Sequence, residues 1–192
     1  MTTPSAEFAR IGGHFGEVAA GVRPEQWDDP SPVPEWAARD VVRHLVEWFP
    51  AFLASSADVH LPPGPSVDDD PAGAWDHLQR EVQAILDDPA SADRVLSNPH
   101  IGSVPLPEAV SRFFTGDVFM HTWDLARATG QDDTLDPEVC AAMLAGMEPI
   151  EDAMRGSGQY GARVDVPDEA DVQSRLLGFI GRDPEWEPPS SA

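Results

Sequence analysis

A chain of 192 residues, 41% of them hydrophobic, is long enough to bury one sizeable core, so we expect a single domain over residues 1–192. The formal net charge of −22 argues against nucleic acid as a partner, because binding to a phosphate backbone requires cationic side chains. All twelve basic residues are arginines, which excludes chemistry that depends on lysine, such as a Schiff base, lysine-anchored pyridoxal phosphate or a P-loop.

Apolar residues recur at spacings of three and four along the chain, and no long alternating pattern appears, which predicts an all-α protein. The first helix is expected over about 5–22 and the second over about 36–57. The Pro-rich stretch "HLPPGPSVDDDP" then predicts an irregular loop before a third helix over about 71–88. A fourth helix is expected from "PLPEAV" to Gly130, and four such helices predict a four-helix bundle.

A shorter fifth helix is predicted after Gly130, with Asp136 as its N-cap and Pro137 at its first position. "QYGARVDVP" reads as extended, and "DEADVQSRLLGFIG" predicts one or two further helical turns. The tail "RDPEWEPPSSA" is expected to fray. The domain is therefore expected to consist of a bundle over about 5–155 and a C-terminal extension over about 156–192.

No membrane span or secretion signal is evident. No stretch approaches the roughly 18 apolar residues that a spanning helix needs, and "MTTPSAEFARIGGHF" lacks the basic start and the apolar run of a signal peptide. We therefore expect a cytoplasmic protein without membrane association. Cys140 is the only cysteine, so an internal disulfide and a structural zinc site built from several cysteines are excluded.

An aspartate and a histidine lie four residues apart in "GDVFMHTWDLARATG" (116–130), within the fourth predicted helix. With Val110 at zero, Asp117 falls at about 340° and His121 at about 20°, on either side of the centre of the apolar face. An ionised carboxylate in an apolar interior must be paired, hydrogen-bonded, neutralised or bound to a metal. Since His44 lies on the apolar face of the second predicted helix, two imidazoles and one carboxylate are predicted to converge.

Such a set suits a divalent cation and leaves coordination positions open for water or substrate. Imidazole favours zinc, nickel, copper or iron, and manganese is a further candidate. The competing interpretation is an Asp117–His121 pair on a wet surface, with His44 as a hydrogen-bonded core histidine. The residue pattern by itself leaves both interpretations open.

Two further aspartates lie about one turn from the histidines. Asp40 precedes His44 and is expected either to orient that imidazole or to stabilise the N-terminus of its helix, with the second role favoured. Asp124 follows His121 and has the same two interpretations.

The remaining histidines are weaker candidates. His14 lies beside glycines at positions 12, 13 and 16, which permit close approach of a ligand or another backbone, so it is a candidate pocket residue. The histidines expected at exposed positions are His60, His77 and His100.

The stretches "WDDPSPVPEWAARDVVRHLVEW" (27–48) and "GDVFMHTWDLARATG" together resemble the DinB-like metal-binding bundle superfamily. Within it, the chain looks most similar to the actinobacterial branch related to the N-terminal domain of the mycothiol-dependent maleylpyruvate isomerase. With the ending "RLLGFIGRDPEW", the resemblance covers most of residues 5–185. It implies that His44, Asp117 and His121 bind a divalent metal, usually zinc. The isomerase itself carries Glu where this chain has Asp117, and it has a larger C-terminal domain.

The ligand set and the resemblance lead us to expect a mycothiol-dependent metalloenzyme of isomerase or S-transferase type, acting on a small electrophilic molecule. Mycothiol is implied by the resemblance, whereas the residues themselves point only to the metal. Metal-assisted hydrolase or lyase chemistry and a non-catalytic ligand-binding bundle with a structural metal are the alternatives. No catalytic acid or base is identified beyond the ligands. The expected partners are a small-molecule substrate and a low-molecular-weight thiol, in a monomer or homodimer.

Overall fold

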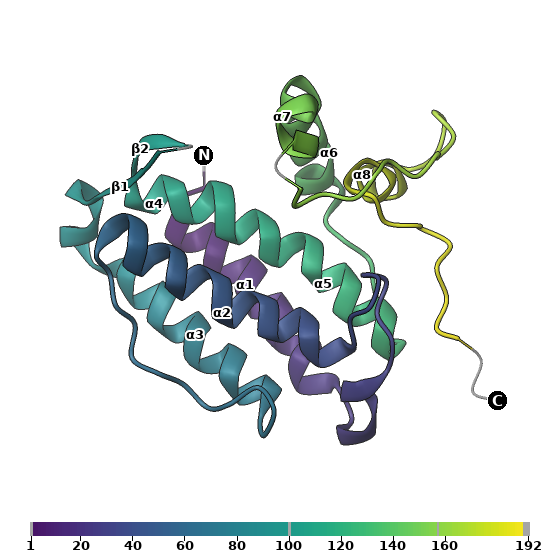
Figure 1. The fold of residues 1–192 in the computed structure, drawn as a ribbon, viewed down its shortest axis with the longest axis horizontal. Coiled ribbons are helices and arrows are strands. Elements are labelled where there is room, and N and C mark those ends of the chain that lie inside the picture. The colour runs from purple at the N-terminus through teal and green to yellow at the C-terminus, as the bar shows by residue number, and fades with distance from the viewer. Residues whose placement is uncertain (1, 100, 157, 190–192) are drawn as a thin grey trace.

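The computed structural model describes residues 2–99, 101–156 and 158–189 and confirms the all-α, DinB-like bundle (Figure 1). The bundle helices are α1 (Pro4–Gly21), α2 (Ala38–Ala57), α3 (Pro71–Asp87) and a long fourth helix. That fourth helix comprises α4 (Leu106–Ala109), a π-helical segment (Val110–Thr115) and α5 (Gly116–Thr129). The chain continues with α6 (Pro137–Met147), α7 (Glu151–Gly156) and α8 (Val172–Ile180). Short 3-10 turns cover Pro24–Asp28, Pro89–Asp93 and Glu148–Ile150.

Side-chain caps fix where two of the helices begin, and a glycine fixes where α5 ends. Asp70 accepts a hydrogen bond from the Gly73 amide at the start of α3. Asp136 accepts from the amides of Glu138 and Val139 at the start of α6, which confirms the predicted cap. Gly130 adopts a left-handed conformation, φ 66°, and ends α5 as predicted.

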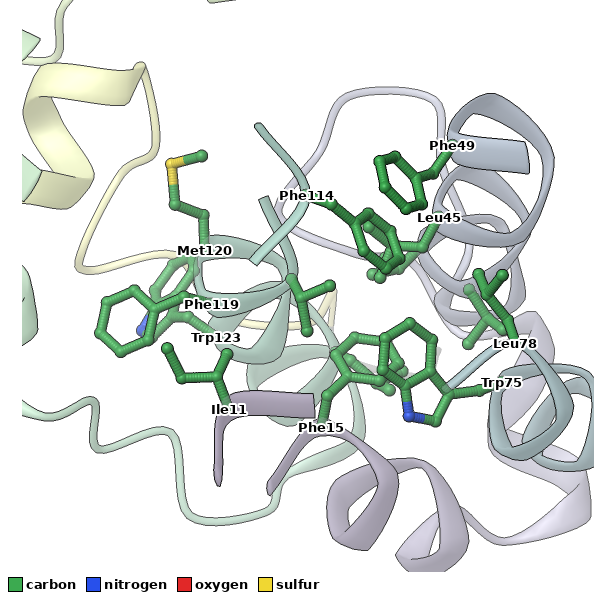
Figure 2. Packing of buried hydrophobic residues seen from close by; sticks show 14 of the residues in the cluster. Ile11, Phe15, Leu45, Phe49, Trp75, Leu78, Phe114, Phe119, Met120 and Trp123 are labelled. Atoms are coloured by element: carbon green, nitrogen blue, oxygen red, sulfur yellow. The ribbon is translucent and has the colours of Figure 1, made fainter. Parts of the chain in front are cut away.

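The four bundle helices form a ring in which α1 and α2 each lie between α3 and α5. Phe114, from the π-helical segment, occupies the centre of the core (Figure 2). Its ring stacks on that of Phe49 of α2, with centroids 3.9 Å apart, and lies 5.8 Å from Phe8 of α1 and 6.2 Å from Trp75 of α3. This one side chain therefore contacts aromatic rings of the other three bundle helices.

The π-helical segment changes the direction in which the later residues of the fourth helix point. A π-turn closes i→i+5 and so holds one extra residue, which shifts the phase of everything that follows by about 100°. The uniform helical phase that we assumed from Val110 onward is therefore wrong across this segment. Val110 and Phe114 are fully buried in the core, whereas Asp117 faces α2 at the edge of the core and remains partly exposed.

A small hairpin precedes the fourth helix and was not predicted. Strands β1 (Val95–Asn98) and β2 (Gly102–Pro105) pair antiparallel, with Leu96 opposite Val104. Only these two facing residues are buried. Strands of four residues are too short to produce an alternating pattern that a sequence reading can separate from a loop.

The C-terminal extension packs beside α5, with α6 against α8 (Figure 1). The segment after α8 does not fray at Arg182–Trp186, contrary to our expectation. The Arg127 guanidinium of α5 donates to the backbone carbonyls of Pro184 and Trp186, at 3.3 and 2.7 Å. Between the bundle helices and this segment, α5 is buried at every position from Val118 to Thr129 except Arg127.

Among the described residues, no helix combines the length and the apolar character that crossing a membrane requires.

Candidate metal centre

The structure brings His44 of α2 next to Asp117 and His121 of α5. The His44 Nε2 lies 3.1 Å from Asp117 Oδ2, and the His121 Nε2 lies 3.5 Å from Asp117 Oδ1. One donor atom from each residue lies within 4.8 Å of the other two. Donors at about 2.1 Å from a tetrahedral cation would be separated by about 3.4 Å, so the residues fit a shared divalent ion.

The cluster lies at the edge of the bundle and is open to solvent on one side. The exposed fractions of the side chains are 32% for His44, 19% for Asp117 and 7% for His121. A cation bound there would keep coordination positions available to a ligand from solution.

Two tryptophans border the cluster. Trp48, one turn after His44 in α2, donates its indole N–H to Asp117 Oδ2 at 2.9 Å. Trp36, just before α2, places its indole 5.1 Å from the His44 ring and 5.8 Å from the His121 ring, nearly parallel to the latter. Trp48 thus fixes the carboxylate, and Trp36 covers both imidazoles on one side.

A buried chain of charged groups orients His121. Its Nδ1 lies 2.8 Å from Oδ2 of Asp124, whose side chain is only 1% exposed. Arg182, which follows α8, holds the same carboxylate with two hydrogen bonds, from Nε to Oδ1 at 2.8 Å and from Nη2 to Oδ2 at 3.0 Å. A proton on Nδ1 that is donated to Asp124 leaves Nε2 free to bind a metal.

These contacts determine the protonation of the buried groups. Burial lowers the pKa of His121, but the negative charge of Asp117 and the hydrogen bond to Asp124 outweigh burial and raise it above its ordinary value. Burial raises the pKa of Asp124, but the contacts with His121 and Arg182 outweigh burial and lower it. Asp124 is therefore an ionised carboxylate at neutral pH.

The C-terminal extension contributes side chains near the cluster. Besides Arg182, Met143 of α6 packs beside Gly116, the residue before Asp117. Tyr160 lies partly buried near Asp117 and Arg182, where burial and the Asp117 charge raise the pKa of its phenol. The surroundings of the cluster thus come from both the bundle and the extension.

The other sequence candidates lie elsewhere or have another task. Asp40 accepts a hydrogen bond from the Ala37 amide at 2.9 Å and so caps α2. His14 borders a different cavity of about 170 Å³, between α1 and α5 and beside Asp136. Our interpretation of the nearby glycines is also revised, because Phe8 and Gln79 fill the space beside Gly12. Gln79 and Trp75 fill the space beside Gly16.

The exposed histidines were predicted with mixed success. His60 is exposed, as expected. His77 is half-buried, contrary to our prediction, because the Pro-rich loop folds over it and its Nε2 lies 2.9 Å from the Pro62 carbonyl oxygen. His100 lies outside the described residues.

Three residues of the centre escaped sequence reasoning as functional candidates. Trp48 lies four residues after His44 and so on the same helix face, but a tryptophan on an apolar helix face is typical of a core residue. Trp36 and Arg182 carry no signal in their spacing, because each reaches the cluster from an irregular segment.

Comparison with known proteins agrees with this geometry. The sequence profile of the mycothiol maleylpyruvate isomerase N-terminal domain matches residues 8–126, more than half of the chain, including all three candidate ligands. Two relatives from Mycobacterium tuberculosis, the uncharacterized protein MT0763 of strain CDC 1551 / Oshkosh and the uncharacterized protein Rv0738 of strain ATCC 25618 / H37Rv, are each 30% identical. Each alignment covers 93% of this chain and 97% of the relative, and so extends into the C-terminal extension. No solved structure matches the chain.

Proposed function

We propose a function from the family to which the chain belongs, that of the mycothiol maleylpyruvate isomerase N-terminal domain within the DinB-like superfamily. The chain is proposed to be a divalent-metal-binding enzyme that uses a thiol to act on a small electrophilic molecule. Mycothiol is the proposed thiol, on the strength of the family description. The proposed reaction is an isomerisation or an S-transfer.

One observation carries the metal part of this proposal. Two imidazole nitrogens and a carboxylate oxygen, from two helices that are distant in sequence, meet within 4.8 Å of one another. Imidazole and carboxylate ligands with open positions suit zinc, and nickel, iron and manganese are the alternatives.

The chain's own residues orient this donor set. Asp124 accepts from Nδ1 of His121 and thereby directs Nε2 of that ring toward Asp117. Trp48 holds Oδ2 of Asp117, while Oδ1 of the same carboxylate lies near His121. Little side-chain rearrangement is then needed when a cation binds, which favours tight binding.

The reactive thiol has to come from outside the chain. Cys140, the only cysteine, is fully buried in α6, and burial raises the pKa of its thiol to about 11. A divalent cation in the centre would lower the pKa of a coordinated external thiol and so supply a thiolate at neutral pH. Neither Tyr160 nor Arg182 is assigned a proton-transfer role.

The first test is metal content. Protein purified without chelator should contain one divalent ion per chain, and His44→Ala should lose most of it. Metal should also raise the melting temperature of the wild-type protein, because it binds the native state. Wild-type protein that retains no divalent ion and does not change its melting temperature would contradict the proposal.

The second test concerns the thiol. Titration of mycothiol into cobalt-substituted protein should produce a saturable thiolate-to-cobalt absorption band, and an alcohol analogue that lacks the sulfur serves as the control. If cobalt is bound but no band develops at millimolar thiol, the thiol-dependent reaction is wrong. A hydrolase, a lyase or a structural metal site would then become the better interpretation.

A further inference from the structure

Two indoles lie against the candidate ligands, alongside the buried Asp124–Arg182 pair and the phenol of Tyr160. The indole of Trp36 lies over both imidazoles, and the half-buried Trp48 borders Asp117 with its N–H already used. Met143 adds a thioether beside Gly116, with its Cε 3.5 Å from the position a Cβ would occupy on that glycine. A molecule that binds here therefore meets flat apolar surfaces.

Trp36 is held firmly in place. Its carbonyl accepts from the Ser31 amide at 2.9 Å, and its own amide donates to the Val33 carbonyl at 3.1 Å. The preceding residue, Glu35, has φ 67°, a conformation that residues other than glycine adopt only where the surrounding structure enforces it. The backbone that carries the indole is thus positioned before any ligand arrives.

Two arginines near the centre, Arg182 and Arg43, are already paired. Arg182 gives two hydrogen bonds to Asp124 and is largely buried. Arg43, the sequence neighbour of His44, is bound by Asp40 at 3.2 Å and by Asp68 at 2.7 Å. A carboxylate on a ligand would thus lose its hydration without gaining a free charge from either arginine.

On the basis of the function proposed above, we propose that the substrate, beyond the one group that reaches the metal, is an uncharged, planar and apolar molecule whose ring packs against Trp36. A dicarboxylate is accordingly a poor substrate. This assigns Trp36 as a specificity-determining residue, because it supplies the surface that the ring contacts.

Three hydroxamic acids separate the contributions of metal and ring, since all three present the same chelating group. Acetohydroxamic acid has no ring, benzohydroxamic acid adds a neutral ring, and 4-carboxybenzohydroxamic acid adds a charge to that ring. We expect calorimetry with zinc-loaded protein to give an affinity for benzohydroxamic acid at least tenfold higher than for the other two. In Trp36→Leu the advantage over acetohydroxamic acid should fall below threefold, whereas Trp36→Phe should retain most of it.

The outcomes distinguish this inference from the proposed function. Equal affinities of wild-type protein for the neutral and the carboxylated ring, or no gain from the ring, would overturn the inference and leave the metal centre intact. Failure of acetohydroxamic acid to bind would overturn both. An unchanged ring advantage in a folded, zinc-loaded Trp36→Leu variant would remove Trp36 from the specificity role. The ligand comparison on wild-type protein remains decisive if that variant does not fold.

Discussion

Replacement of Arg182 by leucine isolates the contact between the C-terminal extension and the candidate metal centre. Arg182 is 14% exposed and Asp124 is 1% exposed, so the change leaves a buried carboxylate without its cation. Removal of one partner of a buried ion pair costs about 3–5 kcal/mol, and His121 still contacts Asp124, so we expect a loss near the lower end, about 3 kcal/mol. Loss of this support should also weaken metal binding by about 10–100-fold, since Asp124 orients His121.

The assay is urea unfolding of the metal-free protein at pH 7, followed by competition between the folded protein and a chelator for zinc. Arg80→Leu is the matched control, because Arg80 and Asp76 form an exposed i,i+4 pair for which about 0.3–0.5 kcal/mol is expected. The double variant Asp124→Asn/Arg182→Leu should recover part of the lost stability, because no unpaired charge remains. An Arg182→Leu variant that stays within about 1 kcal/mol of the control would refute the reasoning.

Three further predictions concern single positions. Gly178→Ala should destabilise the extension by about 1–3 kcal/mol in urea unfolding, because the new Cβ would lie 2.5 Å from Val166 Cγ2. The control Gly146→Ala, with no atom near its Cβ position, should be neutral or stabilising. If Gly146→Ala were the more destabilising of the two, this packing would be contradicted. Native Cys140 should react with a disulfide reagent at pH 8 at least about 100-fold more slowly than the urea-unfolded chain, because a pKa of about 11 leaves little thiolate; equal rates would disprove this. Asp40→Ala should reduce the free energy of unfolding by about 1 kcal/mol through loss of the α2 cap, and it should leave the zinc content unchanged. A loss of zinc would instead assign Asp40 to the metal centre.

The bundle helices were predictable because each carries a strong local signal. Apolar spacing placed α1, α2 and α3 within about two residues, and the Asp136–Pro137 start of α6 follows from elementary capping chemistry. The convergence of His44 with Asp117 and His121 was predictable as well, because a costly polar group on an apolar face needs a partner.

The remaining features depend on contacts that are distant in sequence. The π-helical segment cannot be read from Val110–Thr115 because the residues there suit an ordinary α-helix. Arg182 is one arginine among twelve, and only the folded chain shows that it reaches Asp124. Trp36 is brought to the centre by a loop that is held by backbone hydrogen bonds from Ser31 to Trp36 and from Trp36 to Val33.

The extra residue in the π-helical segment sets the rotational register between the two halves of the fourth helix. Upstream and within the segment, the register suits the aromatic centre at Phe114, and downstream it suits the pair at Asp117 and His121. Deletion of a single residue here would allow a regular α-helix, but it would rotate one half by about 100° relative to the other. Along this stretch, changes of length are therefore far more damaging than exchanges of side chains, and a relative that retains both features has to retain the count of residues between them.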